Sequence, residues 1–170
     1  MAAKKIVEIR IPLIEETIEV EGTAEQLEGR TIRLDLTRIL NGKSIEGVFV
    51  INAKELIAYP RKLTLLNFYI RRVIRKGTDY IEDSFACKSK DALLRIKPFM
   101  IARRKVSRKI RKALRDKAKE IIISSCQDKS AEEIFSEVLS ARIQKELASK
   151  LKKIYPLAVC EIRVIEKEKQ

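Results

Sequence analysis

Residues 101–115 constrain the fold of this chain more than any other stretch. Eight of these fifteen residues are Arg or Lys and none is acidic, yet the apolar residues Val106, Ile110 and Leu114 recur every four positions. That spacing predicts a helix with one face packed on a core and a densely positive face turned outward. Such a face needs a polyanion, and nucleic acid is the common polyanion for a soluble protein.

The positive charge is confined to one region of the sequence. Residues 61–119 hold 20 Lys or Arg and 5 Asp or Glu, a net charge of +15, whereas the whole chain carries +13. The remaining residues therefore carry a net charge of −2, and the first thirty lean acidic, with seven Glu and four basic residues. Because charge that serves only solubility is spread more evenly, this excess predicts a binding face. An ordinary solvated surface is the alternative.

Periodicity predicts a mixture of strands and helices. Alternating or β-branched runs predict strands over residues 5–11, 17–21, 30–36, 43–52, 79–88, 92–101 and 157–165. Apolar residues at helical spacing predict helices over residues 62–76, 103–125, 130–139 and 143–154, and a helical turn over 37–40 that residues 41–42 close. A tight polar link at residues 89–91 predicts a hairpin. This order of elements predicts an α+β fold in which helices cover one side of a sheet.

Local signals place several helix boundaries. The break at Pro60 predicts a helix that begins near Lys62, because the residue before a proline disfavours helix and proline itself is common at a helix start. Gly77 is expected to cap the end of that helix. Ser130, followed three residues later by Glu133, fits a capping box at the start of the next-to-last helix.

The length of 170 residues suits one domain with its own core. We expect a variable N-terminal segment over residues 1–28, a single α+β domain over residues 29–167 and a frayed tail over residues 168–170. No run approaches eighteen apolar residues, which predicts no transmembrane helix. Charged residues interrupt the region where the apolar run of a signal peptide would lie, so a cytoplasmic location is expected.

The residue types argue against an enzyme. The chain has no histidine, which excludes histidine-dependent triads and metal-hydrolase sites, and it has no glycine-rich phosphate loop. Cys87, Cys126 and Cys160 lack the spacing of metal ligands and are expected to be small buried hydrophobes. Solvated positions explain the carboxylate pairs at residues 15–16 and 132–133. We therefore expect no catalytic residues, no metal and no cofactor.

The pattern within the basic helix favours structured RNA as the target. Four arginines follow its apolar stripe at spacings of 4, 3 and 4: Arg104, Arg108, Arg111 and Arg115. Arginine-rich helices bind phosphates and recognise folded RNA by shape. Aromatic residues are scarce, and Phe68, Tyr69, Phe85 and Phe99 are expected in the core rather than as stacking platforms, which argues against a reader of single strands. Charge alone leaves DNA open.

Two other classes of function stay open. A protein-interaction adaptor could dock its basic face on acidic partners or on an anionic membrane. Its partner-helix face would then be the apolar repeat Ile143, Leu147, Leu151 and Ile154, for which a core position is the other interpretation. An RNA-modifying enzyme or nuclease is the third class, and no turnover of RNA is predicted.

Several segments, in this order, resemble the eS1 (S3Ae) family of small-subunit ribosomal proteins, which archaea and eukaryotes share. They are residues 29–41 (GRTIRLDLTRILN), the helix-to-hairpin block that ends at residues 88–95 (KSKDALLR), the arginine-rich helix, residues 153–157 (KIYPL) and residues 161–163 (EIR). The resemblance spans about residues 29–167, and its most specific piece is the IYPL motif with the basic strand that follows it.

The resemblance implies a structural role on the platform of the small subunit, near the messenger exit and the 3′ end of the rRNA. It also implies a twisted, antiparallel, barrel-like sheet flanked by helices, and an archaeal-type length. The implied partners are small-subunit rRNA and neighbouring platform proteins, with no membrane and no homo-oligomer. Family members usually begin with a basic segment that carries a Trp-Tyr pair. This chain departs from that pattern, because it has no Trp and an acidic-leaning N-terminus.

The candidate rRNA-binding residues come from three parts of the basic region: the end of the helix expected over residues 62–76, the hairpin, and the arginine-rich helix. They are Arg71, Arg72, Arg75, Lys76, Lys88, Lys90, Arg95, Lys97, Arg103, Arg104, Lys105, Arg108, Lys109, Arg111, Lys112 and Arg115. We expect them to contact phosphates, while residues 130–165 mainly pack.

Overall fold

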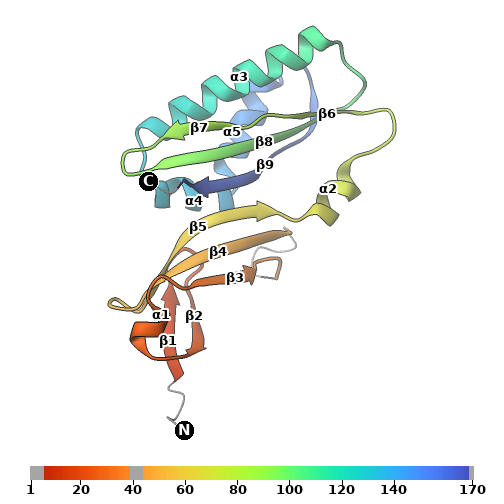
Figure 1. Cartoon of the computed structure of the whole chain (residues 1–170). Coiled ribbons are helices and arrows are strands. Elements are labelled where there is room, and N and C mark those ends of the chain that lie inside the picture. The colour runs from red at the N-terminus through yellow and green to blue at the C-terminus, as the bar shows by residue number, and fades with distance from the viewer. Residues whose placement is uncertain (1–5, 39–43, 169–170) are drawn as a thin grey trace. The chain divides into compact units, whose positions relative to one another are not determined.

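The computed structural model of this protein describes residues 6–38 and 44–168. The chain divides into two compact units, residues 1–63 and residues 64–170, which Figure 1 shows in red to yellow and in yellow to blue. The domain boundary expected at residue 28 stays a prediction. No described helix is long and apolar enough to cross a membrane.

The first unit is mostly sheet. It holds β1 (Ile6–Ile11), β2 (Glu16–Glu21), α1 (Ala24–Leu27), β3 (Thr31–Asp35), β4 (Ile45–Asn52) and most of β5 (Ile57–Leu65). β1 and β2 are antiparallel, β3 and β4 are antiparallel, and β5 pairs with both β4 and β1, the latter in parallel. Along β4, buried and half-buried residues alternate strictly, so one face of the strand lies on the core.

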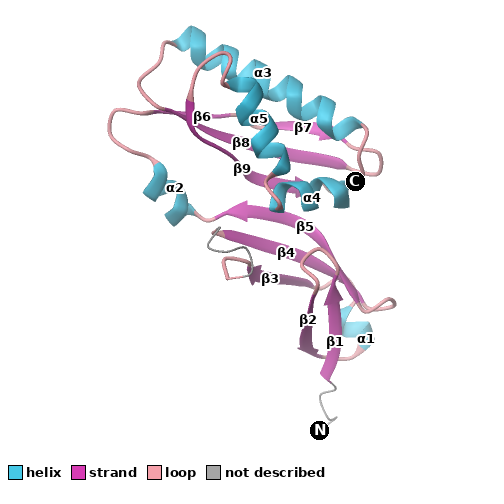
Figure 2. Cartoon of the chain, turned by 180° about the vertical axis from the view of Figure 1, so that it is seen from behind, coloured by secondary structure: helices cyan, strands magenta, loops and turns pink. Residues whose placement is uncertain are grey.

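The second unit combines a sheet with helices. It holds α2 (Asn67–Val73), β6 (Asp79–Glu82), β7 (Phe85–Lys88), β8 (Leu93–Ala102), α3 (Arg108–Gln127), α4 (Ala131–Leu139), α5 (Arg142–Leu151) and β9 (Leu157–Lys167). The central strand β8 is antiparallel to β9 along one edge and to β6 and β7 along the other. α3 packs on β6 and β7, and α5 packs on β9 and α3; Figure 2 shows α4 and α5 in front of β8 and β9.

The basic helix α3 is anchored by a buried apolar stripe, but the stripe begins later than the predicted spacing, because Val106 lies in the loop before α3 and Ile110 is half-buried. Leu114, Ala118 and Ile121 are buried, and Ile122 joins them. Ala113 is exposed, because at 100° per residue it lies about 140° around the helix from Ala118. The stripe holds α3 against the sheet and leaves most of its basic side chains in solvent.

The α+β class and the sheet flanked by helices are confirmed. The described strands do not close into a barrel, and the β1–β5 pair is parallel. The expected hairpin is β7–β8, and the capping box of Ser130 and Glu133 begins α4 with both of its hydrogen bonds. The predicted turn at residues 37–40 lies partly, and residues 41–42 wholly, outside the described residues.

The helix predicted over residues 62–76 is wrong over its first half. Tyr59 and Pro60 lie inside β5, and the helix α2 begins only at Asn67. Leu63 and Leu65 are buried while Thr64 between them is half-buried, which is the period of a strand. An extended residue before proline suits a strand as well as a helix boundary.

The end of that helix also differs from the prediction. α2 is capped at Ile74, whose N–H donates to the carbonyl oxygen of Ile70. Gly77 lies three residues further on, in a turn, with a φ of 89° that favours glycine. The strand predicted over residues 79–88 is likewise interrupted at residues 83–84, which separate β6 from β7.

The basic helix begins at Arg108, five residues later than predicted. Ser107 caps it, because its Oγ accepts a hydrogen bond from the N–H of Ile110. Arg103, Arg104 and Lys105 therefore lie in the preceding loop. A run of charged residues does not indicate where a helix begins. A serine does so when its side chain accepts a hydrogen bond from one of the first backbone N–H groups, which have no partner within the helix.

Candidate nucleic-acid interface

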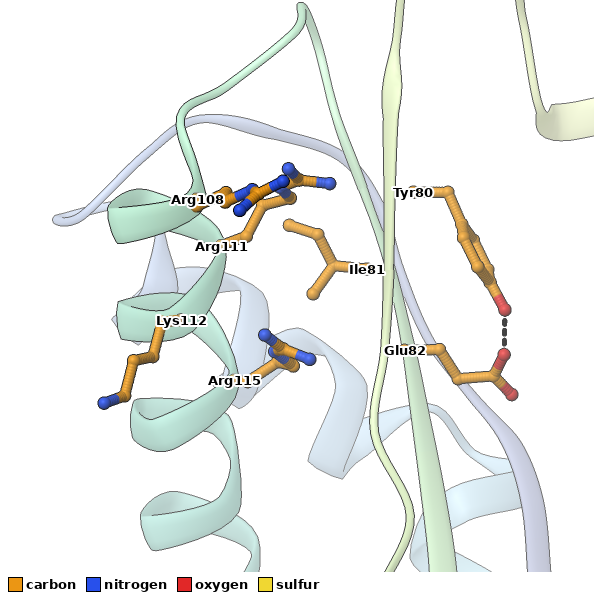
Figure 3. Close-up of a pocket in the computed structure, with 7 residues that line it drawn as sticks. All are labelled: Tyr80, Ile81, Glu82, Arg108, Arg111, Lys112 and Arg115. Atoms are coloured by element: carbon orange, nitrogen blue, oxygen red, sulfur yellow. Dashed lines mark hydrogen bonds between the residues drawn. The ribbon is translucent and has the colours of Figure 1, made fainter.

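Four of the predicted residues line one groove between α3 and β6, with a volume of about 500 Å³. Its lining residues are Arg108, Arg111, Lys112 and Arg115 from α3, and Tyr80, Ile81 and Glu82 from β6. Figure 3 shows the three arginines directed toward β6, whereas Lys112 points away from the strand. The groove thus gathers guanidinium groups that the sequence predicted to share a helix face.

Helix geometry explains why these arginines converge. The steps from Arg108 to Arg111 and Arg115 rotate by about −60° and −20° around the helix axis, so all three project to one side. The capping hydrogen bond of Ser107 fixes the start of that row. The preceding loop is tied to the sheet as well, because the N–H of Val106 donates to Oδ2 of Asp79 at 2.7 Å.

The one carboxylate that lines the groove, Glu82, is already engaged. Its two carboxylate oxygens accept hydrogen bonds from Nη1 of Arg163 at 2.7 and 2.9 Å, and Tyr80 donates its hydroxyl to the same carboxylate. Figure 3 shows Tyr80 and Glu82 on the side of β6 away from α3, while Ile81 faces the helix. Glu82 therefore offsets the charge of Arg163 rather than that of the α3 arginines.

The groove is consequently rich in uncompensated positive charge. Within the described residues, no salt bridge joins Arg108, Arg111 or Arg115 to a carboxylate. Arg108 and Arg115 are exposed, and Arg111 is half-buried. Like charges spaced this way destabilise a helix by about 0.2–0.5 kcal/mol per pair, and a bound polyanion would remove that repulsion.

A second basic depression, with a volume of about 550 Å³, lies near the same end of β8 but is lined by residues of α2 and β9. Its lining residues are Arg72, Val73, Arg75, Thr78, Ile101, Arg103, Ala158 and Val159. The guanidinium of Arg72 lies 5.5 Å from the ring centroid of Tyr69. Burial and the nearby charge of Glu161 raise the pKa of Tyr69, and Arg72 opposes them, so the tyrosine stays a neutral support for the arginine.

The hairpin between β7 and β8 presents two exposed lysines on a fixed turn. The N–H of Lys90 donates to the carbonyl oxygen of Lys129 at 3.2 Å, and Oδ1 of Asp91 accepts from the N–H of Ala131, the first residue of α4, at 2.8 Å. Burial raises the pKa of Asp91, but its hydrogen bonds with Ala131 and Ser89 outweigh burial and leave that pKa below its usual range. Lys88 and Lys90 are exposed on this turn.

The other predicted residues are distributed less uniformly. Arg95 forms a salt bridge with Glu168, its Nε lying 2.6 Å from Oε1, so its charge is compensated. Lys97 is half-buried. Five predicted residues are exposed but line neither hollow: Arg71, Lys76, Arg104, Lys105 and Lys109.

Sequence reasoning missed the residues that fix this surface. Ser107 carried a signal, since a serine before a helical run is a cap candidate. Asp79, Asp91 and the pair of Glu82 with Arg163 carried none, because their partners are 27 to 81 positions away.

The cysteines offer no chemistry at this surface. Cys87 and Cys126 are buried and contact each other; the hydrogen bond to Cys87 and burial raise the pKa of Cys126. Burial raises the pKa of the half-buried Cys160 to about 12. In the described ranges, no three or more His, Cys, Asp or Glu side chains gather as metal ligands would.

Comparison with known proteins decides the family. The sequence profile of the Ribosomal S3Ae family matches residues 14–170. The chain belongs to this family. It is a family of ribosomal structural proteins rather than of enzymes, so the resemblance drawn from the motifs is confirmed, as is the expectation of no enzymatic activity.

Archaeal members of the S3Ae family are similar to most of the chain. "Small ribosomal subunit protein eS1" of Nanoarchaeum equitans is 30% identical over 159 residues, which cover 87% of this chain and 80% of the relative. The protein of the same name from Archaeoglobus fulgidus is 25% identical over 84% of this chain and 72% of its own length. That of Methanothermobacter thermautotrophicus is 30% identical over 58% of this chain and 52% of its length. The archaeal type expected from the chain length agrees with these relatives.

Proposed function

We propose that this chain is a structural protein of the small subunit of the cytoplasmic ribosome, and that it binds the rRNA of that subunit at the platform, near the messenger exit. Its family and the names of its archaeal relatives support the small subunit. The platform location rests on the motif resemblance. Neighbouring platform proteins would be its protein partners, and no catalytic step is part of the role.

The observation that carries rRNA binding is the α3 groove. Arg108, Arg111 and Arg115 converge on it from a helix whose other face is buried, and Glu82 is engaged by Arg163. Guanidinium groups bind phosphate oxygens in a two-pronged geometry that lysine cannot reproduce. A rigid row of them matches the backbone of folded RNA, which proteins recognise mainly through phosphates and shape.

The sharpest test removes these three charges and no others. In the variant Arg108→Gln/Arg111→Gln/Arg115→Gln, the dissociation constant for a small-subunit rRNA transcript should rise on the order of 100-fold near 0.1 M salt, at about 1 kcal/mol per lost phosphate contact. The salt dependence should flatten too, with the log–log slope falling in magnitude by about 2 to 3. Filter binding over a salt series measures both quantities.

A matched control separates position from net charge. Lys145, Lys152 and Lys153 are exposed on or just after α5, and Lys145→Gln/Lys152→Gln/Lys153→Gln removes the same charge. We expect this control to change the affinity less than 3-fold. Equal losses in the two triple variants, or an affinity that does not respond to salt, would contradict rRNA binding through the groove. Crosslinking of lysines on intact small subunits then tests the platform location.

A further inference from the structure

The depression formed by Arg72, Arg75 and Arg103 differs in chemistry from the α3 groove. Its other lining residues are almost all apolar: Val73, Ile101, Ala158 and Val159. Among the residues that the structure describes, no carboxylate lines it. Contact with the outside of an RNA helix needs no apolar wall, because phosphates and sugars cover that surface. An apolar wall beside three guanidinium groups suits a nucleotide whose base is unstacked.

The wall of the depression is shaped by a break in strand pairing. Ile101 of β8 lies opposite Val159 of β9, and Ala102 lies opposite Leu157, so Ala158 has no opposite residue in β8. Such a β-bulge bends its strand and redirects a side chain, and bulges are common beside binding sites. Here the bulged residue is an exposed alanine, which leaves a shallow apolar floor.

An exposed aromatic ring extends this surface along α2. Phe68 was expected in the core, yet its side chain is 56% exposed. It precedes Arg72 by one helical turn, so both project from the same side of α2. Aromatic faces that stand beside cations are the usual stacking platforms for unpaired bases.

We propose that this depression binds an unpaired segment of RNA, with one base on the apolar floor at Ala158, the flanking phosphates on Arg72, Arg75 and Arg103, and a neighbouring base on Phe68. This assignment deepens the proposed function, because it rests on RNA binding. It divides the second unit into a groove for the backbone of folded RNA and a depression for unpaired nucleotides.

The experiment compares a fluorescent uridine tetranucleotide, its abasic analogue and a blunt RNA duplex. Ala158→Phe fills the floor without changing charge, and phenylalanine is favourable in an exposed strand position. It should raise the dissociation constant for the tetranucleotide about 10-fold, in line with about 1–3 kcal/mol for one stacked base, and leave duplex binding within 2-fold. The abasic analogue lacks the bases for both the floor and Phe68, so it should bind the wild-type chain more weakly than the tetranucleotide binds Ala158→Phe.

Two controls keep the result interpretable. Ala86→Phe makes the same substitution at another exposed strand residue, in β7, which pairs with the opposite end of β8. If Ala158→Phe does not fold, Arg103→Gln replaces it, with Arg104→Gln as its control, because Arg104 is exposed and adjacent in sequence but lines neither hollow. Arg103→Gln should weaken tetranucleotide binding at least 3-fold more than Arg104→Gln.

Three outcomes would overturn the assignment. They are equal binding of the tetranucleotide by both members of a variant pair, equal binding of the abasic analogue, and displacement of the tetranucleotide by an oligoglutamate peptide of equal charge. The last would indicate an acidic protein as the occupant. None of these outcomes would contradict rRNA binding through the α3 groove. Failure of that binding would appear instead in the variants of Arg108, Arg111 and Arg115.

Discussion

The two units of this chain are both built around sheets but differ sharply in charge. Residues 1–63 hold 10 basic and 10 acidic residues, whereas residues 64–170 hold 27 and 14. The whole net charge of +13 thus belongs to the second unit. The second unit also contains a long helix, α3, whose apolar face is buried and whose opposite face carries the charged side chains. The described residues of the first unit include no such helix.

The difference shows that a row of charges at fixed spacing requires an element with one buried face. In α3, Leu114 and its neighbours bury one face, so the arginines of the other face keep a fixed spacing. In the first unit, exposed charges alternate with buried residues along a strand, as Glu8 and Arg10 do on either side of Ile9 in β1, and the two signs are equal in number. The α3 groove, with its row of arginines, follows from the first arrangement, whereas a hollow in the first unit has lining residues Glu25, Glu28, Ala53 and Lys54.

The largest expected effect comes from loosening the base of α3. Leu114 is fully buried, so Leu114→Ala should lower the free energy of unfolding by about 3 kcal/mol and weaken rRNA binding several-fold, because the arginine row loses its rigid support. Phe49→Ala, at a fully buried residue of β4, should cost about as much stability but leave affinity unchanged. Chemical denaturation and filter binding measure the two quantities. If Phe49→Ala weakens binding as much as Leu114→Ala, the functional contrast between the units is wrong.

Much of this contrast could be predicted from the sequence. Charge counts located the basic region, and the periods of two and of about 3.6 located most strands and the buried stripe of α3. The error at residues 62–66 arose because Leu63 and Leu66 fit a helical period while Leu63 and Leu65 fit a strand, and only burial distinguishes them. Local propensity cannot choose between the two patterns, since tertiary packing decides.

The candidate site was predictable only in part. Spacing alone brought Arg108, Arg111 and Arg115 together, because a helix fixes its own geometry. The depression could not be predicted, because its lining residues come from α2, the end of β8 and β9, and because its floor depends on the register at Ala158. The prediction that Phe68 lies in the core was wrong for a related reason. Its apolar side chain does not indicate whether other elements pack over the short helix α2.

The next effect concerns the anchor of the hairpin in the second unit. Asp91→Ala removes the acceptor for the first N–H of α4 and should cost about 1 kcal/mol of stability. The pKa of Asp91 is lowered in the folded chain, so its contribution is present above the unfolded value of about 3.9 and is lost as the pH falls through the folded value. The stability difference from the wild type should therefore be full at pH 6 and shrink below about pH 4. Asp128→Asn, at an exposed carboxylate, is the control for denaturation at each pH.

The smallest expected effect tests whether placement or net charge governs binding. Glu19 lies directly opposite Glu8 in the antiparallel β1–β2 pair, where like charges repel. Glu19→Lys should raise the free energy of unfolding by about 0.5 kcal/mol, and Glu19→Gln by about half as much, since it removes the repulsion without adding an attraction. Glu19→Lys also gives the first unit a net charge of +2 in place of zero. If the total charge of the chain governed rRNA binding, Glu19→Lys would bind rRNA more tightly than the wild type. Because the arginines that we propose for rRNA binding are held by α3 and the strands of the second unit, we expect the dissociation constant to stay within 2-fold of the wild-type value.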